Sequence, residues 1–140
     1  MGCDIHAHIE IKIKGKDHWI HWNQASISRD YSLFEKMAGV RGSLSNAIYE
    51  PKGFPDDATE GTKLDYEQWG EDAHTPGYLN LKEIAEVEKW YGETYPGIAS
   101  WNFSKQLGWL FGNTFGGYFE FRHDYPEYLE DARIVFWFDC

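Results

Sequence analysis

Several features that define common protein classes are scarce or missing in this chain of 140 residues. No apolar run approaches the ~20 residues that a membrane-spanning helix needs. There is also no glycine-rich phosphate loop, no Cys-x-x-Cys pair and no Gly-x-Ser-x-Gly nucleophile motif. Cysteine is limited to Cys3 and Cys140, too few for a disulfide scaffold of this length. We therefore predict two free thiols in a protein of the reducing cytoplasm, without a membrane partner.

Basic residues are scarce as well. The chain has 13 lysines and arginines against 23 aspartates and glutamates, and its formal net charge is −10. A broad surface for nucleic acid or an anionic membrane needs a basic patch, so the composition argues against both. An anion site must therefore draw on the few arginines, which are Arg29, Arg41, Arg122 and Arg133.

Aromatic residues, by contrast, are abundant. They make up 18% of the chain, with 7 Trp, 9 Tyr and 9 Phe. For any single ring, packing in the core is the simpler expectation. So many large rings also favour an aromatic-lined ligand pocket or a homo-oligomer interface.

The most informative stretch is 3–14, in which apolar and polar residues alternate. A period of two predicts a β-strand with one face in the core. The other face carries Asp4, His6, His8 and Glu10. Imidazole and carboxylate groups bind transition metals, so this row is one candidate metal site if further ligands join it. It can equally be the wet face of an antiparallel sheet. A narrower interpretation keeps only the first carboxylate and the first imidazole, as an oriented pair.

The remaining pattern predicts a mixed fold. A second strand is expected at 18–22 and a last strand at 132–140. Three helices are expected, one with an N-cap at 30–38, one with a capping box at 80–91 and one at 100–112, with helical turns around 64–69. Strands at both ends with helices between them predict one α+β domain over 1–140. We expect a small antiparallel sheet containing the adjacent N- and C-terminal strands. About three helices would pack on one face, and the chain would include a long ordered loop.

That loop spans 40–78, which shows no amphipathic period. A segment of this length in a compact domain is often functional. Asp72 and His74 within it are candidates to complete a site begun by Asp4 and His6. The alternative is an ordinary polar turn.

Arg29, Tyr31 and Arg41 bracket the helix predicted at 30–38. An arginine beside a helix N-terminus suits an anion, and guanidinium groups recognise phosphate through paired hydrogen bonds. The alternative is salt bridges to a very acidic surface.

Several longer motifs occur together, and with them the chain resembles a family of small, largely uncharacterised proteins of tailed phages and bacterial prophages. The opening Met1–His6 with Glu10 is quite specific. In relatives the position of His8 is often aromatic or aliphatic. The resemblance therefore argues against a row of four metal ligands and favours Asp4, His6 and Glu10 as the functional residues. The resemblance implies an accessory protein that acts in the host cytoplasm. The other shared motifs are Arg29–Phe34 with Ala38–Arg41, Pro51-x-Gly53-x-Pro55-x-Asp57, Asp72-x-His74 and Arg133–Asp139.

Three functions fit these observations, and we favour binding over catalysis. The first is sequestration of a phosphorylated small molecule, such as a nucleotide signal of host defence. Arg29 and Arg41 would hold phosphate and Tyr31 or a Trp would stack, while other polar residues (Asp4, His6, Asp72, His74) line the site. The second is a metal-dependent phosphoester hydrolase with ligands drawn from Asp4, His6, His8 and His74. The third is an acidic protein that inhibits a host factor. The sequence identifies no cofactor.

Overall fold

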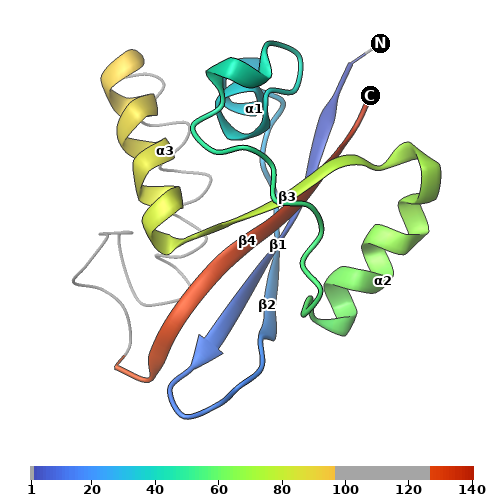
Figure 1. Ribbon diagram of the computed structural model, residues 1–140, viewed down its shortest axis with the longest axis vertical. Coiled ribbons are helices and arrows are strands. Elements are labelled where there is room, and N and C mark those ends of the chain that lie inside the picture. The colour runs from blue at the N-terminus through green and yellow to red at the C-terminus, as the bar shows by residue number, and fades with distance from the viewer. Residues whose placement is uncertain (1, 97–126) are drawn as a thin grey trace.

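The computed structural model describes residues 2–96 and 127–140 (Figure 1). The helix predicted at 100–112 lies outside these residues. The described elements are β1 (Asp4–Ile13), β2 (Ile20–Ala25), α1 (Tyr31–Ala38), η1 (Leu44–Asn46), α2 (Glu60–Trp69), η2 (Gly70–Asp72), β3 (His74–Asn80), α3 (Leu81–Thr94) and β4 (Leu129–Asp139).

The strands form one antiparallel sheet in the order β2-β1-β4-β3. The first and last strands are its two central members, and they pair from Asp4 opposite Asp139 to Ile13 opposite Leu129. The α+β class and the adjacent terminal strands are therefore confirmed. Both ends of the chain consequently lie at one end of the sheet (Figure 1).

Local signals position the helices as the sequence predicts. The side chain of Asp30 accepts a hydrogen bond from the backbone N–H of Leu33 at 3.1 Å, which caps the N-terminus of α1. Gly39 ends this helix in the left-handed conformation, with φ 75°. Asn80 and Glu83 form both hydrogen bonds of the capping box that begins α3.

The strand β3 was not predicted, because Thr75-Pro76-Gly77 has the composition of a turn. β3 lies at the edge of the sheet, where a proline removes no hydrogen bond that a central strand would need. Its pairing with β4 also shifts register between His74 and Gly77. The segment 40–78 is therefore ordered, as expected, but it contains a strand and a ten-residue helix.

The helices lie on both faces of the sheet, not on one (Figure 1). α1 and α3 cover the apolar face, where the rings of Phe34 and Phe138 pack 5.1 Å apart. α2 covers the opposite face, where the ring of Tyr66 lies 5.1 Å from that of Trp137. The sequence suggests one helical face because α2 carries no clear apolar stripe. Its contacts combine hydrogen bonds of Thr62 and Asp65 with the ring packing of Tyr66.

The middle of the polar side of β1, at His8 and Glu10, is buried beneath α2 and is not a wet face, whereas the side chain of Asp4 at the start of the strand is half-exposed. Glu10 is fully buried and Arg133 is 4% exposed. The Glu10 carboxylate accepts hydrogen bonds from the guanidinium of Arg133 at 2.8 Å, from the backbone N–H and hydroxyl of Thr59, and from the hydroxyl of Thr62. These bonds satisfy the buried charge and hold the start of α2 against the sheet.

Among the described helices, none is long and apolar enough to span a bilayer.

Candidate functional site

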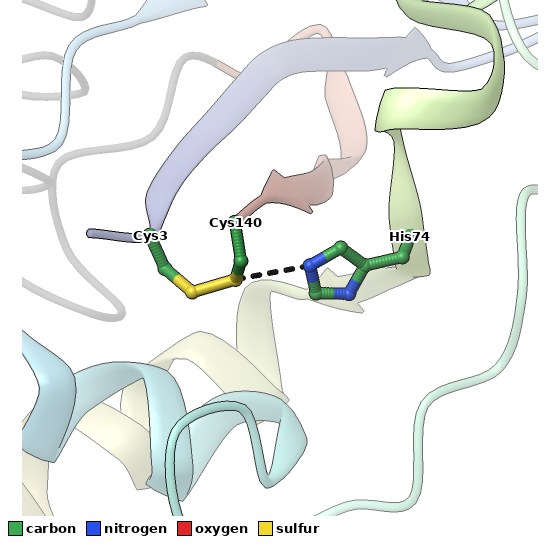
Figure 2. A group of neighbouring side chains, drawn as sticks. All are labelled: Cys3, His74 and Cys140. Carbon is green, nitrogen blue, oxygen red and sulfur yellow. Dashed lines mark hydrogen bonds between the residues drawn. A yellow bond between two sulfur atoms is a disulfide. The ribbon is translucent and has the colours of Figure 1, made fainter. Parts of the chain in front are cut away.

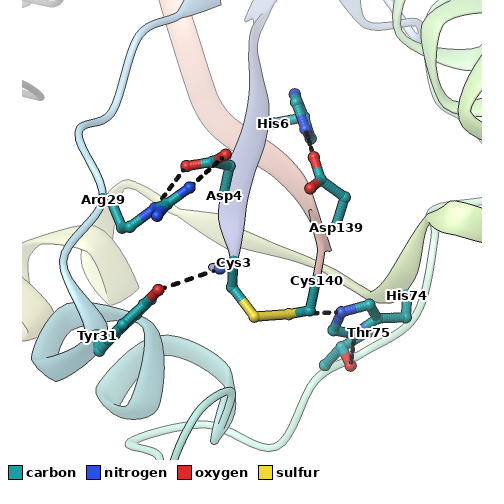
Figure 3. The surroundings of a disulfide bond; sticks show 9 residues. All are labelled: Cys3, Asp4, His6, Arg29, Tyr31, His74, Thr75, Asp139 and Cys140. Atoms are coloured by element: carbon teal, nitrogen blue, oxygen red, sulfur yellow. Dashed lines mark hydrogen bonds and ion pairs between the residues drawn. A yellow bond between two sulfur atoms is a disulfide. The ribbon is translucent and has the colours of Figure 1, made fainter. Parts of the chain in front are cut away.

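A disulfide joins Cys3 and Cys140 at the end of the sheet where the termini meet (Figure 3). The prediction of two free thiols is wrong for this structure. The reason is the pairing of β1 with β4, which places the residues that flank Asp4 and Asp139 side by side. Cys3 is fully buried, whereas Cys140 is exposed.

The imidazole of His74 points at this disulfide (Figure 2). Its Nε2 atom lies 3.0 Å from Sγ of Cys140, and its Nδ1 atom lies 2.9 Å from the hydroxyl of Thr75. A disulfide sulfur carries no hydrogen, so a neutral ring must donate through Nε2 and accept the Thr75 hydroxyl at Nδ1. The first residues of β3 thereby hold the ring in a defined orientation.

A cavity of about 490 Å³ opens beside the disulfide. That volume lies within the range of small-molecule sites. Its walls come from the end of α1 and the turn after it, from η1, from the segment at 50–51, and from the start of β3. The charged and polar groups along it include Arg41, Glu50, His74 and Thr75, and Cys140 completes the wall.

The turn that carries Arg41 is tightly held. A Cβ at Gly39 would come within 2.6 Å of the backbone of Leu44, so only glycine allows this close approach. The carboxylate of Glu35 accepts the backbone N–H of Ser43 at 2.7 Å. This hydrogen bond keeps the pKa of Glu35 below its usual value, because it stabilises the charged form. The guanidinium of Arg41 stacks 4.5 Å from the centre of the Tyr31 ring.

Two residues along this cavity have unusual backbone geometry. Arg41 has φ 62° and Thr75 has φ 52°, and they are the non-glycine residues with positive φ in the described parts of the chain. This conformation costs roughly 1–2 kcal/mol for a residue with a Cβ. Such strain clusters at functional sites, where the surrounding structure enforces it.

The predicted anion residue Arg29 is engaged elsewhere. Its Nε and Nη2 atoms donate to the two oxygens of Asp4 at 3.0 and 2.9 Å (Figure 3). This paired bond lowers the pKa of Asp4, since it stabilises the carboxylate. The hydroxyl of Tyr31 accepts the backbone N–H of Cys3 at 3.2 Å. Asp4 and Arg29 therefore brace the start of β1 at the edge of the site, as the salt-bridge interpretation of this arginine expects.

The predicted row of metal ligands does not converge. His6 pairs with Asp139 and its ring lies 4.0 Å from that of Trp69. His8 bonds through Nε2 to Asp65 at 2.6 Å and through Nδ1 to His21 at 2.9 Å. Each imidazole thus has its own partners beneath α2.

In the described ranges, a different set of side chains gathers the atoms that can bind a metal, although two of them are joined here in the disulfide. The ligand atoms of Cys3, His74 and Cys140 lie within 4.8 Å of one another. Asp4, His6 and His8 are not members of this group. Asp72 is exposed in η2, outside the cavity wall.

Of the predicted residues, Arg41 and His74 thus line the cavity, and Tyr31 stacks on Arg41. The structure adds Thr75 and the disulfide, which the sequence interpretation missed. The position of the cysteines next to two strands already expected to be neighbours was a signal for the disulfide. The strained Thr75 backbone had none. No family model, curated protein or solved structure matches this chain.

Proposed function

We propose that this protein binds a phosphorylated small molecule, such as a nucleotide signal, in the cavity beside the disulfide. The observation that carries the proposal is the coincidence of the cavity with Arg41 and Thr75, the two strained residues. A fold that maintains such strain at two positions along one cavity holds its polar groups in place before a ligand arrives.

Arg41 supplies the positive charge for a phosphate, and its stacking on Tyr31 limits the orientations that the guanidinium can take. The hydroxyl of Thr75 can accept a further hydrogen bond, and the imidazole of His74, held between Thr75 and Cys140, lines the same cavity. Because the net charge of −10 repels an anion over the whole surface, attraction must come from these local groups.

The resemblance to phage and prophage proteins extends this proposal to a biological role. A small phage protein that binds a nucleotide signal would act by sequestering it in the host cytoplasm, without turning it over. The hydrolase with Asp4, His6 and His74 as ligands and the acidic inhibitor of a host factor stay predictions. Among the described residues, neither Asp4 nor His6 belongs to the metal-compatible group, which favours the binding role over the hydrolase.

Isothermal titration calorimetry of the oxidised protein against cyclic dinucleotides, cyclic trinucleotides and ADP-ribose derivatives tests the proposal. We expect one of these classes to bind with a stoichiometry of one ligand per protein chain. Arg41→Gln should weaken that binding by about 10- to 100-fold, the value of a charge-assisted hydrogen bond of ~1.5–3 kcal/mol. Lys63→Gln, a matched loss of charge at an exposed position of α2, should leave it unchanged.

Two results would overturn the proposal. One is the absence of binding across the whole panel. The other is a ligand whose affinity is the same for the wild type and for Arg41→Gln, because it would then bind outside this cavity.

A further inference from the structure

We propose that reduction of the Cys3–Cys140 disulfide converts this end of the sheet into a zinc site with Cys3, His74 and Cys140 as its protein ligands. The proposal rests on the positions of these three side chains and does not depend on anion binding. Two thiolates and one imidazole, with one position left to solvent, form a known class of zinc coordination.

The three ligand atoms are already gathered. They lie within 4.8 Å of one another, and Nε2 of His74 is 3.0 Å from Sγ of Cys140 (Figure 2). A tetrahedral zinc ion with ordinary bond lengths needs sulfur atoms about 3.8 Å apart and a nitrogen about 3.6 Å from each sulfur. Breaking the sulfur–sulfur bond lets the two sulfurs move apart toward that spacing, by rotation of the cysteine side chains.

The chemistry balances as two steps. A dithiol reductant gives two electrons and two protons to the disulfide, which yields two thiols and oxidises the reductant to its own disulfide. Zinc then binds both sulfurs as thiolates, and two protons are released to solvent. His74 binds as the neutral ring and gives up no net proton. Because thiolates are the metal ligands, the oxidised protein lacks the site.

The surroundings of His74 suit a metal ligand. A zinc-bound imidazole usually donates its other N–H to an oxygen, which fixes the ring. In the reduced protein, Nε2 binds the metal, so the proton moves to Nδ1 and can be donated to the Thr75 hydroxyl, 2.9 Å away. Thr75 accepts this bond without moving, since its hydroxyl can both donate and accept.

The cavity supplies the open position. His74 and Cys140 line it, while Cys3 is buried behind them. A water molecule in the cavity can therefore complete the four-coordinate zinc. The protein would carry a covalent bond between its terminal strands when oxidised and a metal bridge between the same strands when reduced.

Cobalt(II) is the probe for the test, because thiolate-bound cobalt has a charge-transfer absorption that zinc lacks. The full chain is reduced with a phosphine under nitrogen and titrated with cobalt(II). We expect one cobalt per chain with thiolate charge transfer, and its displacement by zinc(II). The oxidised protein should bind no cobalt and show no thiolate charge-transfer band.

Variants locate the site. His74→Ala should weaken cobalt binding at least tenfold, and Cys140→Ser should reduce the thiolate absorption by about half or abolish binding. Thr75→Val removes the oxygen that orients the ring, and it should cost about 10- to 100-fold. His18→Ala, at an exposed histidine of the β1–β2 turn, should have no effect.

The proposal fails if the reduced protein is folded by circular dichroism and shows no charge-transfer band, or if His74→Ala binds cobalt as the wild type does. Reduction could also unfold the chain. In that event recovery of the folded spectrum on addition of zinc supports the site, and no recovery overturns it.

Discussion

Loss of the disulfide should destabilise the protein strongly, even if no apolar packing is lost with it. The bond links residues 137 positions apart, almost the whole length of the chain. Closing a loop of that length removes conformational entropy from the unfolded chain, worth about 5 kcal/mol at 25 °C in the chain-entropy model. Since measured values often fall below this limit, we expect a loss of about 3–5 kcal/mol.

Cys140→Ser is the suitable variant, because Cys140 is exposed and a serine there costs little by itself. Cys3 is fully buried, so a substitution there would mix loss of the disulfide with damage to the core. Urea unfolding, followed by tryptophan fluorescence in the presence of a metal chelator, measures the change. With a slope of about 2 kcal/mol per molar urea, the midpoint should fall by roughly 1.5–2.5 M.

Reductant provides the internal control. It should lower the midpoint of the wild type to that of Cys140→Ser and leave the variant unchanged. A difference below ~0.5 M between the oxidised wild type and Cys140→Ser would refute the reasoning, because it corresponds to only ~1 kcal/mol. The unfolded chain would then gain little freedom when the bond is absent.

Three further substitutions test the fold around the site. Glu10→Ala should cost about 3–5 kcal/mol, because it leaves a buried guanidinium without its main partner, whereas Glu67→Gln on the exposed side of α2 should change the urea midpoint little. Gly39→Ala should destabilise the protein more than Gly15→Ala. Both glycines have φ near 80°, but of the two only Gly39 would bring an added Cβ against backbone atoms. Equal thermal midpoints for the two variants would contradict this reasoning. Burial, and then the charge of a neighbouring histidine, hold the pKa of His21 below 6.5, so the folded state binds its proton less tightly than the unfolded state. Stability should therefore fall as pH drops below about 6.5, and His21→Gln should flatten this part of the profile measured by urea unfolding; parallel profiles would contradict it.

Local sequence signals were enough to predict most of the secondary structure. The alternation in β1 and the caps of α1 and α3 depend on residues a few positions apart, so they can be recognised in the sequence alone. The α+β class followed from the order of these elements. β3 escaped recognition because the sheet edge, not the strand's own residues, makes a proline acceptable there.

The candidate site could be predicted only in part, because it too depends on tertiary contacts. Arg41, Tyr31 and His74 were chosen for their chemistry, and the structure brings them to one end of the sheet. The sequence did not distinguish Arg29 from Arg41, because only the folded chain places Asp4 against the first of them. The packing of α2 against Glu10, His8 and Trp137 likewise required knowledge of which polar groups find partners across the sheet.

The sequence by itself therefore determined most of the elements, the acidic character and the set of reactive side chains, since these depend on composition and short-range periodicity. Tertiary structure alone decided which of those side chains meet. Pairing of the first strand with the last brings Cys3 next to Cys140, and the return of the chain through β3 places His74 beside them. Contacts between residues so distant in sequence arise from strand order and register, which no local pattern specifies.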